Sequence, residues 1–287
     1  MILAIVRRIG ATAAPTLAAV VVAACSTDPG AASPAGADAG ATLDGCASLF
    51  GRPNAKTGVG ADLCRPSCSC GGKDFTPPDY DAAFVRALVE GYALSTPTAP
   101  IAGDPYAGPA PKPDPEGTVC GVVLGGSAGQ APRPYDLVTY ATEAEALAAG
   151  ARPTHFGRCG ACSSLANLAV YVRENDLAAP VRECGLQGGG EAANVACLEQ
   201  LGFERPCAEA WYWDTVHTKE QCLAVCLAEL GSPYQLPDGT LNPCIQCDEE
   251  KSGPVFKAVA GRTRRNSGLP NSLCRPCSEV RPLVHAY

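Results

Sequence analysis

Cysteine content is the feature that most constrains how this chain can fold. The sequence of 287 residues contains 17 cysteines, and all but one of them lie between Cys46 and Cys277. An even number of cysteines in an exported chain predicts a disulfide framework, because thiols oxidise in pairs and remain oxidised outside the cytoplasm. The pairing itself is left open, since the remaining cysteines could pair in about two million ways.

The N-terminus carries the pattern of an export signal. Arg7 and Arg8 precede a charge-free run over residues 9–24, which is shorter than the ~20 apolar residues of a membrane span. The end of this run, Val22-Ala23-Ala24-Cys25, resembles the lipobox of bacterial lipoproteins. The resemblance implies cleavage before Cys25 and acyl chains on Cys25, and Ser26 in the next position resembles the members sorted to the outer membrane. An ordinary signal peptide with an incidental cysteine is the alternative.

This signal predicts a protein of the cell envelope, periplasmic or surface-exposed, that contacts the membrane through the acyl chains on Cys25. More than one acyl chain is what stable anchoring requires. Loss of Arg7 and Arg8 with the signal would change the formal charge from −7 to −9. Export and an acidic charge both argue against nucleic acid as a partner.

Composition divides the chain into five segments. Residues 1–24 are the predicted lipoprotein signal peptide, and residues 25–44, rich in Ala, Gly, Pro and Ser, are expected to be a flexible tether. Residues 45–95 form a cysteine-rich N-terminal module, and residues 96–117 form a proline-rich linker or a long ordered loop. Residues 118–287 form a cysteine-rich, mainly helical main domain.

Hydrophobic periodicity predicts a mainly α fold with a small β component, in a disulfide-rich extracytoplasmic domain. Short strands are expected in residues 118–126 and 135–141, which are rich in β-branched and aromatic side chains. Asp79 or Asp81 can cap a first helix that ends near residue 94, and Thr142 forms a capping box with Glu145. Further helices are expected at about 162–174, 191–202, 206–217 and 219–230, with Thr218 capping the last of them.

Residues 154–172 place two cysteines and a histidine directly before a helical apolar stripe. Cys162 falls on the same helix face as Leu165, so a structural disulfide is the favoured interpretation. The stretch CGACS also resembles the C-G-[SA]-C-[WY] block of papain-like cysteine proteases, which implies a nucleophilic Cys162 with His155 as an unorthodox base. The chain departs from that family at Ser163, which replaces the aromatic residue, and at Phe156, which replaces the glutamine.

Two other interpretations of the cysteines stay open. Cys159 and Cys162 could form a thioredoxin-like redox pair, which needs a strand directly before it. Zinc could be bound by His155 with these two cysteines, or by the CxxC pairs Cys244/Cys247 and Cys274/Cys277. Oxidation competes for every thiol in an exported chain, so we expect no metal and no cofactor.

The C-terminal segment is basic within an acidic chain. From Lys251 to Tyr287 there are seven Lys and Arg residues and one acid. Guanidinium groups bind carboxylates and phosphates bidentately, so the cluster predicts a surface that binds an anionic small molecule, a glycan or an envelope partner. The alternative is that the arginines pair internally with Asp248, Glu249 and Glu250. The predicted ligand-binding residues are Lys257, Arg262, Arg264, Arg265 and Arg275.

We therefore predict a lipid-anchored, disulfide-rich envelope protein that binds an anionic ligand or partner. The alternative is an extracytoplasmic hydrolase or acyl-transfer enzyme that uses Cys162 and His155, or an acid beside the basic cluster such as Asp248. The blocks around residues 154–172 and 253–269 resemble those of uncharacterised exported cysteine-rich proteins, and this resemblance implies no activity.

Overall fold

The largest sheet has four strands in the order β5-β7-β6-β8. They are β5 (Tyr92–Leu94), β6 (Val119–Leu124), β7 (Arg133–Tyr140) and β8 (Arg152–Phe156), within a computed structural model that describes residues 45–287. Strand β6 pairs antiparallel with both neighbours, and β5 runs parallel to β7. The two predicted strands are confirmed as β6 and β7. Strand β8 was not predicted, because its sequence RPTHF lacks a clear alternation of apolar and polar residues.

The two smaller sheets contain the first strands of the described chain, and one of them also contains its last strand. The first has the order β2-β1-β9, formed by β2 (Cys64–Arg65), β1 (Leu49–Phe50) and β9 (Arg275–Pro276). The second pairs β3 (Cys68–Cys70) with β4 (Lys73–Phe75). Residues from both ends of the described chain therefore share one sheet, so the predicted modules 45–95 and 118–287 are not separate. Residues 45–287 belong to one compact unit.

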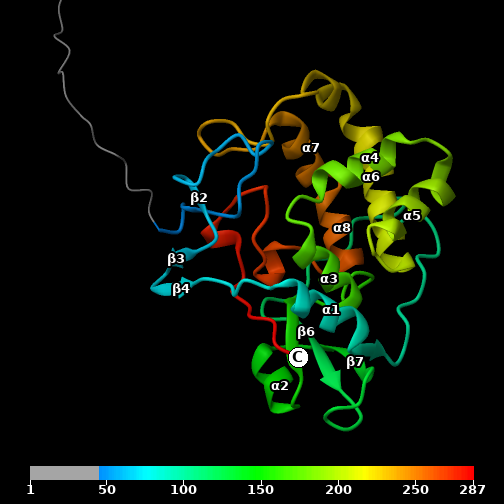
Figure 1. The fold of residues 1–287 in the computed structure, drawn as a ribbon. Helices are drawn as coiled ribbons and strands as arrows, with labels where there is room; N and C mark the ends of the chain where they lie inside the picture. The colour runs from blue at the N-terminus through cyan, green and yellow to red at the C-terminus, as the bar shows by residue number, and fades with distance from the viewer. Residues whose placement is uncertain (1–44) are drawn as a thin grey trace, which may run out of the picture. The chain divides into compact units, whose positions relative to one another are not determined.

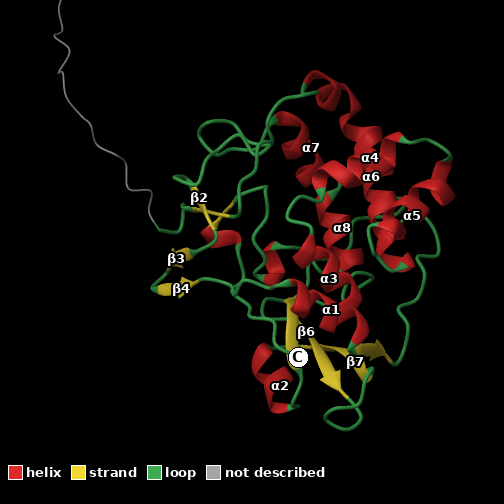
Figure 2. Ribbon diagram, viewed as in Figure 1, coloured by secondary structure: helices red, strands yellow, loops and turns green. Residues whose placement is uncertain are grey.

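The described residues form eight α-helices, which contain more residues than the strands do. Figure 2 shows α4 to α8 gathered at one end of the domain and the four-stranded sheet at the other. No helix in residues 45–287 combines the length and the apolar character needed to span a membrane. The helices are α1 (Ala82–Glu90), α2 (Glu143–Ala148), α3 (Leu165–Arg173), α4 (Ala178–Leu186), α5 (Gly190–Gln200), α6 (Arg205–Ala228), α7 (Pro243–Lys251) and α8 (Gly253–Ala260).

Local capping signals located two helix starts correctly. The side chain of Asp81 accepts a hydrogen bond from the Phe84 amide, and that of Thr142 accepts one from the Glu145 amide. The two helices predicted at 206–217 and 219–230 are instead the single 24-residue helix α6. Thr218 does not cap a helix start, because its hydroxyl bonds across to Asp248 and Ser252. No glycine or proline lies between residues 207 and 228 to interrupt the helix.

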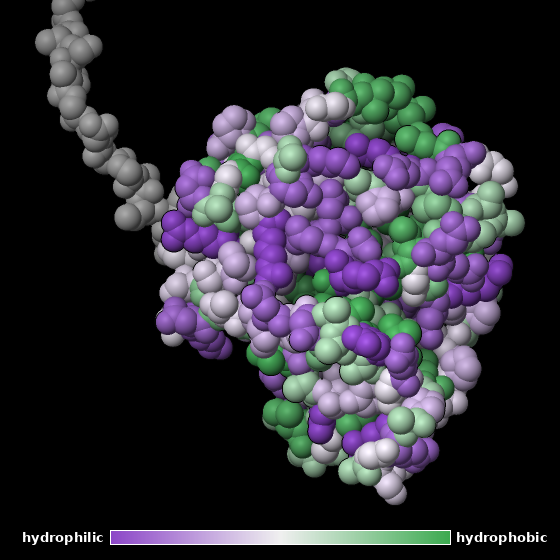
Figure 3. Space-filling view, viewed as in Figure 1, coloured by the Kyte–Doolittle hydropathy of each residue, from purple (hydrophilic) through white to green (hydrophobic). Residues whose placement is uncertain are grey.

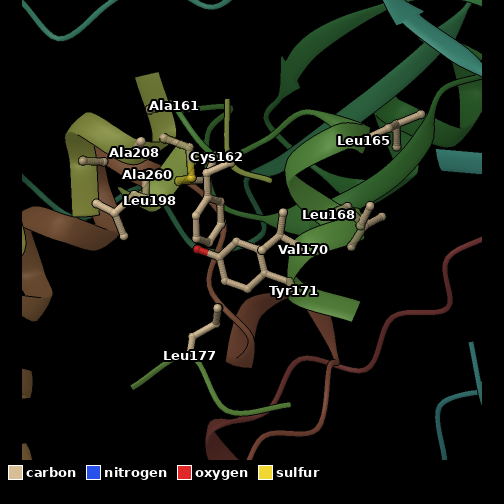
Figure 4. Close-up of a cluster of buried hydrophobic side chains, with 14 of the residues drawn as sticks. Ala161, Cys162, Leu165, Leu168, Val170, Tyr171, Leu177, Leu198, Ala208 and Ala260 are labelled. Atoms are coloured by element: carbon tan, nitrogen blue, oxygen red, sulfur yellow. A yellow bond between two sulfur atoms is a disulfide. The ribbon is translucent and has the colours of Figure 1, made fainter. Parts of the chain in front are cut away.

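Helix α3 lies at the centre of the main core. Its residues Leu165, Leu168, Val170 and Tyr171 are all at most 2% exposed. Figure 4 shows them with Cys162 and with residues of α5, α6 and α8 around them. This core packs the helices of the domain against one another, and it includes the sulfur atom of Cys162.

Eight disulfides cross-link the described residues, so the protein is disulfide-rich as predicted. They use every cysteine from Cys46 to Cys277, and they indicate an oxidising, extracytoplasmic compartment. Two of them join residues more than 200 positions apart and bind the N-terminal strands to the C-terminal segment. The pairs are Cys46–Cys70, Cys64–Cys274, Cys68–Cys277, Cys120–Cys159, Cys162–Cys207, Cys184–Cys197, Cys222–Cys247 and Cys226–Cys244.

The proline-rich segment 96–117 is an ordered loop, one of its two predicted alternatives. Its backbone is fixed on α6, where the Ile101 amide donates to the carboxylate of Glu209 at 2.9 Å. Tyr106 packs on the same helix by stacking on His217. The tether predicted at 25–44, the signal at 1–24 and the lipidation site Cys25 lie outside the described residues.

Candidate functional site

Cys162 carries no free thiol. It is fully buried and bonded to Cys207 of α6. Its neighbour Cys159 is bonded to Cys120 of β6, so the two cysteines do not form a redox pair with each other. The interpretation of Cys162 as a nucleophile is wrong, because a sulfur held in a disulfide cannot supply the thiolate that attacks.

His155 is likewise not a base for Cys162. It is fully buried on β8, and its Nε2 lies 2.7 Å from Ser163 Oγ, while its Nδ1 lies 3.1 Å from the Phe156 carbonyl oxygen. A carbonyl only accepts, so Nδ1 carries the proton and the Ser163 hydroxyl donates to Nε2. Burial and the nearby charge of Arg262 hold the pKa of His155 well below its usual range, so the ring is neutral. Both side chains are completely buried, so this serine–histidine pair joins β8 to the segment before α3 and cannot contact a substrate.

The remaining zinc interpretation also fails on the sulfur pairing. Cys244 and Cys247 are bonded to Cys226 and Cys222 of α6. Cys274 and Cys277 are bonded to Cys64 and Cys68. Both CxxC pairs therefore bridge to other elements, and their thiolates are not available as metal ligands.

Arg262 is an internal cross-link rather than a surface residue. Its side chain is fully buried, and its guanidinium donates only to uncharged acceptors. Nε reaches the Cys162 carbonyl at 3.1 Å, Nη1 the Thr154 carbonyl at 2.8 Å, and Nη2 the Thr154 hydroxyl at 2.7 Å and the Ser163 carbonyl at 2.9 Å. Burial lowers the pKa of this group. Arg262 therefore connects β8 to the start of α3, and the prediction that it binds an external anion is wrong.

Arg264 is also used inside the protein. It is 8% exposed, and its Nη1 donates to the Pro270 carbonyl at 3.0 Å, while its Nη2 donates to the Glu174 carbonyl. Its guanidinium lies 5.7 Å from the centre of the Tyr171 ring, which adds a cation–π contact. Burial lowers the pKa of Arg264 to about 10, so the group remains charged at neutral pH. A ligand could reach little of this side chain.

Arg265 and Arg275 form an ion-pair network, as the internal alternative predicted. Both guanidiniums bind the carboxylate of Glu249, Arg265 at 2.5 Å, and Arg265 also binds Glu279 at 2.8 Å. Only Lys257, on α8, presents an exposed side chain among the five predicted ligand-binding residues. The structure therefore does not bring the five together as one surface for an anion.

Asp248, predicted as a possible catalytic acid, belongs to a polar group between α6 and α7. We call this group the acid cluster, and it faces the loop that follows β5. Within it, the hydroxyl of Tyr106 lies 3.2 Å from Asp214 Oδ1 and 3.1 Å from the Ser252 carbonyl oxygen. The Tyr106 ring stacks on His217 with ring centres 4.1 Å apart. The acid cluster consists of Tyr106, Asp214, His217, Thr218, Asp248 and Ser252.

Hydrogen bonds connect His217 to Asp248 in one chain. His217 Nδ1 lies 3.0 Å from Ser252 Oγ, which lies 2.6 Å from Thr218 Oγ1, and the Thr218 hydroxyl donates to Asp248 Oδ1. Because Thr218 uses its proton on the carboxylate, Ser252 donates to Thr218 and the imidazole N–H donates to Ser252. Such a chain can pass a proton between an imidazole and a carboxyl group.

Both carboxyl groups of the acid cluster hold their protons more tightly than usual. Burial raises the pKa of Asp248 to about 6, with a further rise from the charge of Glu249 and a decrease from the Thr218 hydrogen bond. Burial and the neighbouring Asp248 raise the pKa of Asp214 well above its usual range. Strongly perturbed carboxyl groups that lie together are a common mark of functional sites.

Sequence reasoning found Asp248 but missed Asp214 and Tyr106. Asp214 stands in the run AWYWDTV, where an acid among aromatic residues on a helix is a signal of a buried carboxyl. Tyr106 had no such signal, because it lies in a proline-rich loop that is 108 residues away from Asp214 in the chain. The contact between them exists only because the loop folds back over α6.

Replacing Asp248 by asparagine is expected to raise the free energy of unfolding by about 2 kcal/mol near pH 7.5 and to change it little near pH 3.5. A carboxyl whose folded pKa is about 6, above the ordinary 3.8, destabilises the folded state as the pH rises through that interval. The amide removes this cost and still accepts a hydrogen bond from Thr218. Urea unfolding at both pH values measures the effect.

Glu220→Gln is the matched control for this prediction, because Glu220 is an exposed acid on the neighbouring helix α6. It should leave the difference between the two pH values unchanged. A gain from Asp248→Asn that is the same at acid and neutral pH would contradict a raised pKa.

Two hollows in the surface of the described domain lie away from the acid cluster. A cavity of about 510 Å³ opens between α2, β8 and the C-terminal residues, lined by apolar side chains together with Glu143 and Arg152. A crevice of about 40 Å³ beside Arg52 and Arg264 has room for little more than a water molecule. Tyr106 covers the acid cluster, with its ring stacked on His217 and its hydroxyl beside Asp214.

Comparison with known protein families places the acid cluster in a recognised segment. Residues 191–282, from α5 to the short 3₁₀ helix at Cys277–Glu279, match a family described as "Family of unknown function (DUF8771)". No curated protein and no solved structure matches the chain. Apart from Tyr106, the residues of the acid cluster therefore lie in the part of the chain that is similar to a family without an assigned activity.

Proposed function

We propose that this protein is a lipid-anchored protein of the bacterial cell envelope, whose disulfide-stapled domain works as a rigid binding module. The observation that carries the proposal is the pairing of every cysteine from Cys46 to Cys277 in a disulfide. Such a domain belongs in an oxidising compartment and has no thiolate with which to attack a substrate.

The anchor itself rests on the lipobox that ends at Cys25. The described domain begins at Gly45, so the 19 residues 26–44 separate it from the proposed lipid site. Cysteine 25 is the one cysteine of the chain outside the range of the eight pairs, which leaves the paired set complete without it. Lipidation requires a cysteine at this position of the lipobox.

Fewer residues can bind an anionic ligand than the sequence suggested. Arg262, Arg264 and Arg275 are no more than 9% exposed, and Arg265 is committed to two carboxylates. An anionic ligand would have to be bound by exposed cations such as Lys257 on α8 and Arg281 in the C-terminal segment. We therefore propose a binding module for an envelope partner and do not assign its ligand to the buried arginines.

Mass spectrometry of the native protein from its bacterial envelope tests the anchor and the disulfides together. We expect a mature N-terminus at Cys25 that carries acyl chains, and no alkylation of any cysteine before reduction. The Cys25→Ser variant should lose the acyl chains and leave the membrane fraction. A free, alkylatable thiol at Cys162 or a membrane-independent protein with intact Cys25 would contradict the proposal.

A second candidate function is acid–base catalysis by the acid cluster, which the raised pKa of Asp248 favours. A carboxyl with a pKa of about 6 can exchange protons near neutral pH, and the chain from His217 could pass a proton to it. Hydrolysis of envelope glycans by the wild type and its loss in Asp214→Asn and Asp248→Asn would support this function. Equal turnover by wild type and both variants would exclude it.

A further inference from the structure

The outer half of α6 carries an exposed row of leucines. Leu223 and Leu227 lie four residues apart on one side of α6, and Leu230 and Leu236 follow in the turn and the loop after the helix. Their exposed fractions run from 44% to 65%, which is high for large apolar side chains. We call these four residues the leucine ridge. Figure 3 shows an apolar patch over the C-terminal end of α6, where the ridge lies.

Two disulfides fix the helix that carries the leucine ridge. Cys222 and Cys226 are bonded to Cys247 and Cys244 of α7, so the outer half of α6 is stapled at two successive turns. The cysteines point to α7, while the leucines stand about a quarter turn away around the helix. The helix therefore cannot turn to bury the ridge against the rest of the domain, and the apolar row is presented permanently.

One member of the leucine ridge, Leu236, lies in a loop that contacts the N-terminal part of the described chain. The Tyr234 amide of this loop donates to the Lys56 carbonyl and the Gln235 amide to the Thr57 carbonyl, both at 2.8 Å. Figure 1 shows this loop beside the segment near β2. The chain enters the domain at Gly45, at most ~70 Å of backbone from Cys25.

We propose that the leucine ridge docks the domain on the lipid bilayer that holds the acyl chains of Cys25. This inference rests on the proposed lipid anchor. The anchor keeps the domain at the membrane, so a small apolar contact is sufficient to orient it. The ridge exposes on the order of 400 Å² of apolar surface, about half of the ~800 Å² that each partner buries in a stable protein complex.

The charges beside the leucine ridge indicate an apolar rather than an electrostatic contact with the membrane. Lys219 and Glu220 are exposed beside it and Glu229 is half-buried, and together they give no positive patch. Attraction to anionic headgroups therefore contributes little, and the contact depends on inserting leucine side chains among the lipid chains. Docking should be independent of anionic lipid and of salt.

Fluorescence quenching by lipid tests the contact in the full, acylated protein. Leu227→Trp and, as the matched control on the sheet, Val138→Trp are each reconstituted in phosphatidylcholine vesicles that contain brominated phosphatidylcholine. Val138 is 37% exposed on β7, away from the ridge. We expect brominated lipid to quench the added tryptophan at least twofold more in Leu227→Trp than in Val138→Trp, and to do so equally at low and high salt. Leu230→Trp repeats the measurement at a second ridge position.

The outcomes separate this inference from the anchor on which it rests. A protein that floats with the vesicles but shows the same quenching at residues 227, 230 and 138 overturns the docking and leaves the anchor intact. The same holds if the acylated protein floats as a dimer whose ridge tryptophans stay unquenched, because a second copy then covers the ridge. Wild type that fails to float, like Cys25→Ser, overturns both the anchor and the docking.

Discussion

Replacing Arg262 by methionine is expected to lower the free energy of unfolding by about 5 kcal/mol. Methionine fills much of the same volume but leaves the carbonyls of Thr154, Cys162 and Ser163 buried without a donor. Each such acceptor costs about 1–3 kcal/mol, and removal of a buried charge offsets part of the sum. Arg262→Lys should recover only part of the loss, because an ammonium group cannot reach acceptors on both sides as the planar guanidinium does.

Denaturant unfolding with the disulfides intact measures this effect. Lys257→Met is the matched control, since Lys257 is an exposed cation on the helix just before Arg262, and it should stay within about 0.5 kcal/mol of wild type. An Arg262→Met variant within about 1 kcal/mol of wild type would show that β8 and the start of α3 do not depend on this residue.

Removing two long-range disulfides together is expected to cost far more than the sum of removing each alone. Cys64–Cys274 and Cys68–Cys277 close nearly the same loop, of 210 and 209 residues. With one bridge present, the other closes only the roughly seven residues between the two pairs, which is worth about 2 kcal/mol. With both replaced by alanine pairs, the whole loop opens, and the loss rises to about 7 kcal/mol.

Unfolding of the two double variants and of the quadruple variant measures this non-additivity, as in a mutant cycle. Limited proteolysis provides a second readout, since the N-terminal strands β1 to β4 should become cleavable only when both bridges are absent. A quadruple variant whose loss equals the sum of the two double variants would show that the bridges act independently.

Below pH 6.5, the dependence of the free energy of unfolding on pH is expected to include a contribution from His285, which lies outside the acid cluster. Burial lowers the pKa of His285 to about 3, and its ring accepts or donates only to Ser267 and Tyr287. A histidine with a lowered folded pKa stabilises the protein above its ordinary pKa of 6.5, and this contribution is lost as the pH falls toward 3. The raised pKa of Asp248 acts in the opposite direction over part of this range, so single variants are needed to separate the two.

The arginines show why local charge was a poor guide to the site. The sequence correctly identified a basic segment, because the charge of a segment follows from the identities of its residues. Whether a guanidinium faces water depends on acceptors elsewhere, and for Arg262 these lie about 100 residues away, on β8 and before α3. The sequence therefore identified a basic segment correctly, but four of its five predicted anion-binding residues are buried or paired inside the protein.

The acid cluster gives the same lesson for a carboxyl. Asp248 could be named from the sequence, but its raised pKa arises from burial between two helices, and its charge in turn raises the pKa of Asp214, 34 positions earlier in the chain. Helix α6 had to be one continuous helix to bring Asp214 and Thr218 to the same side of α7. The sequence predicted a helix start at Thr218, because Thr218 followed by Gln221 has the pattern of a capping box. The same residues also occur within a helix, where the threonine hydroxyl can bond to a neighbouring helix instead.

The sequence by itself determined the features that depend on neighbouring residues or on counting. These are the disulfide-rich character, the oxidising compartment, the strands β6 and β7, and the caps at Asp81 and Thr142. Only the tertiary structure decided which sulfur meets which, which arginines are buried and which carboxyls share a site. The physical reason is that each of these depends on the approach of groups far apart in the chain, and that approach is set by packing of the whole core.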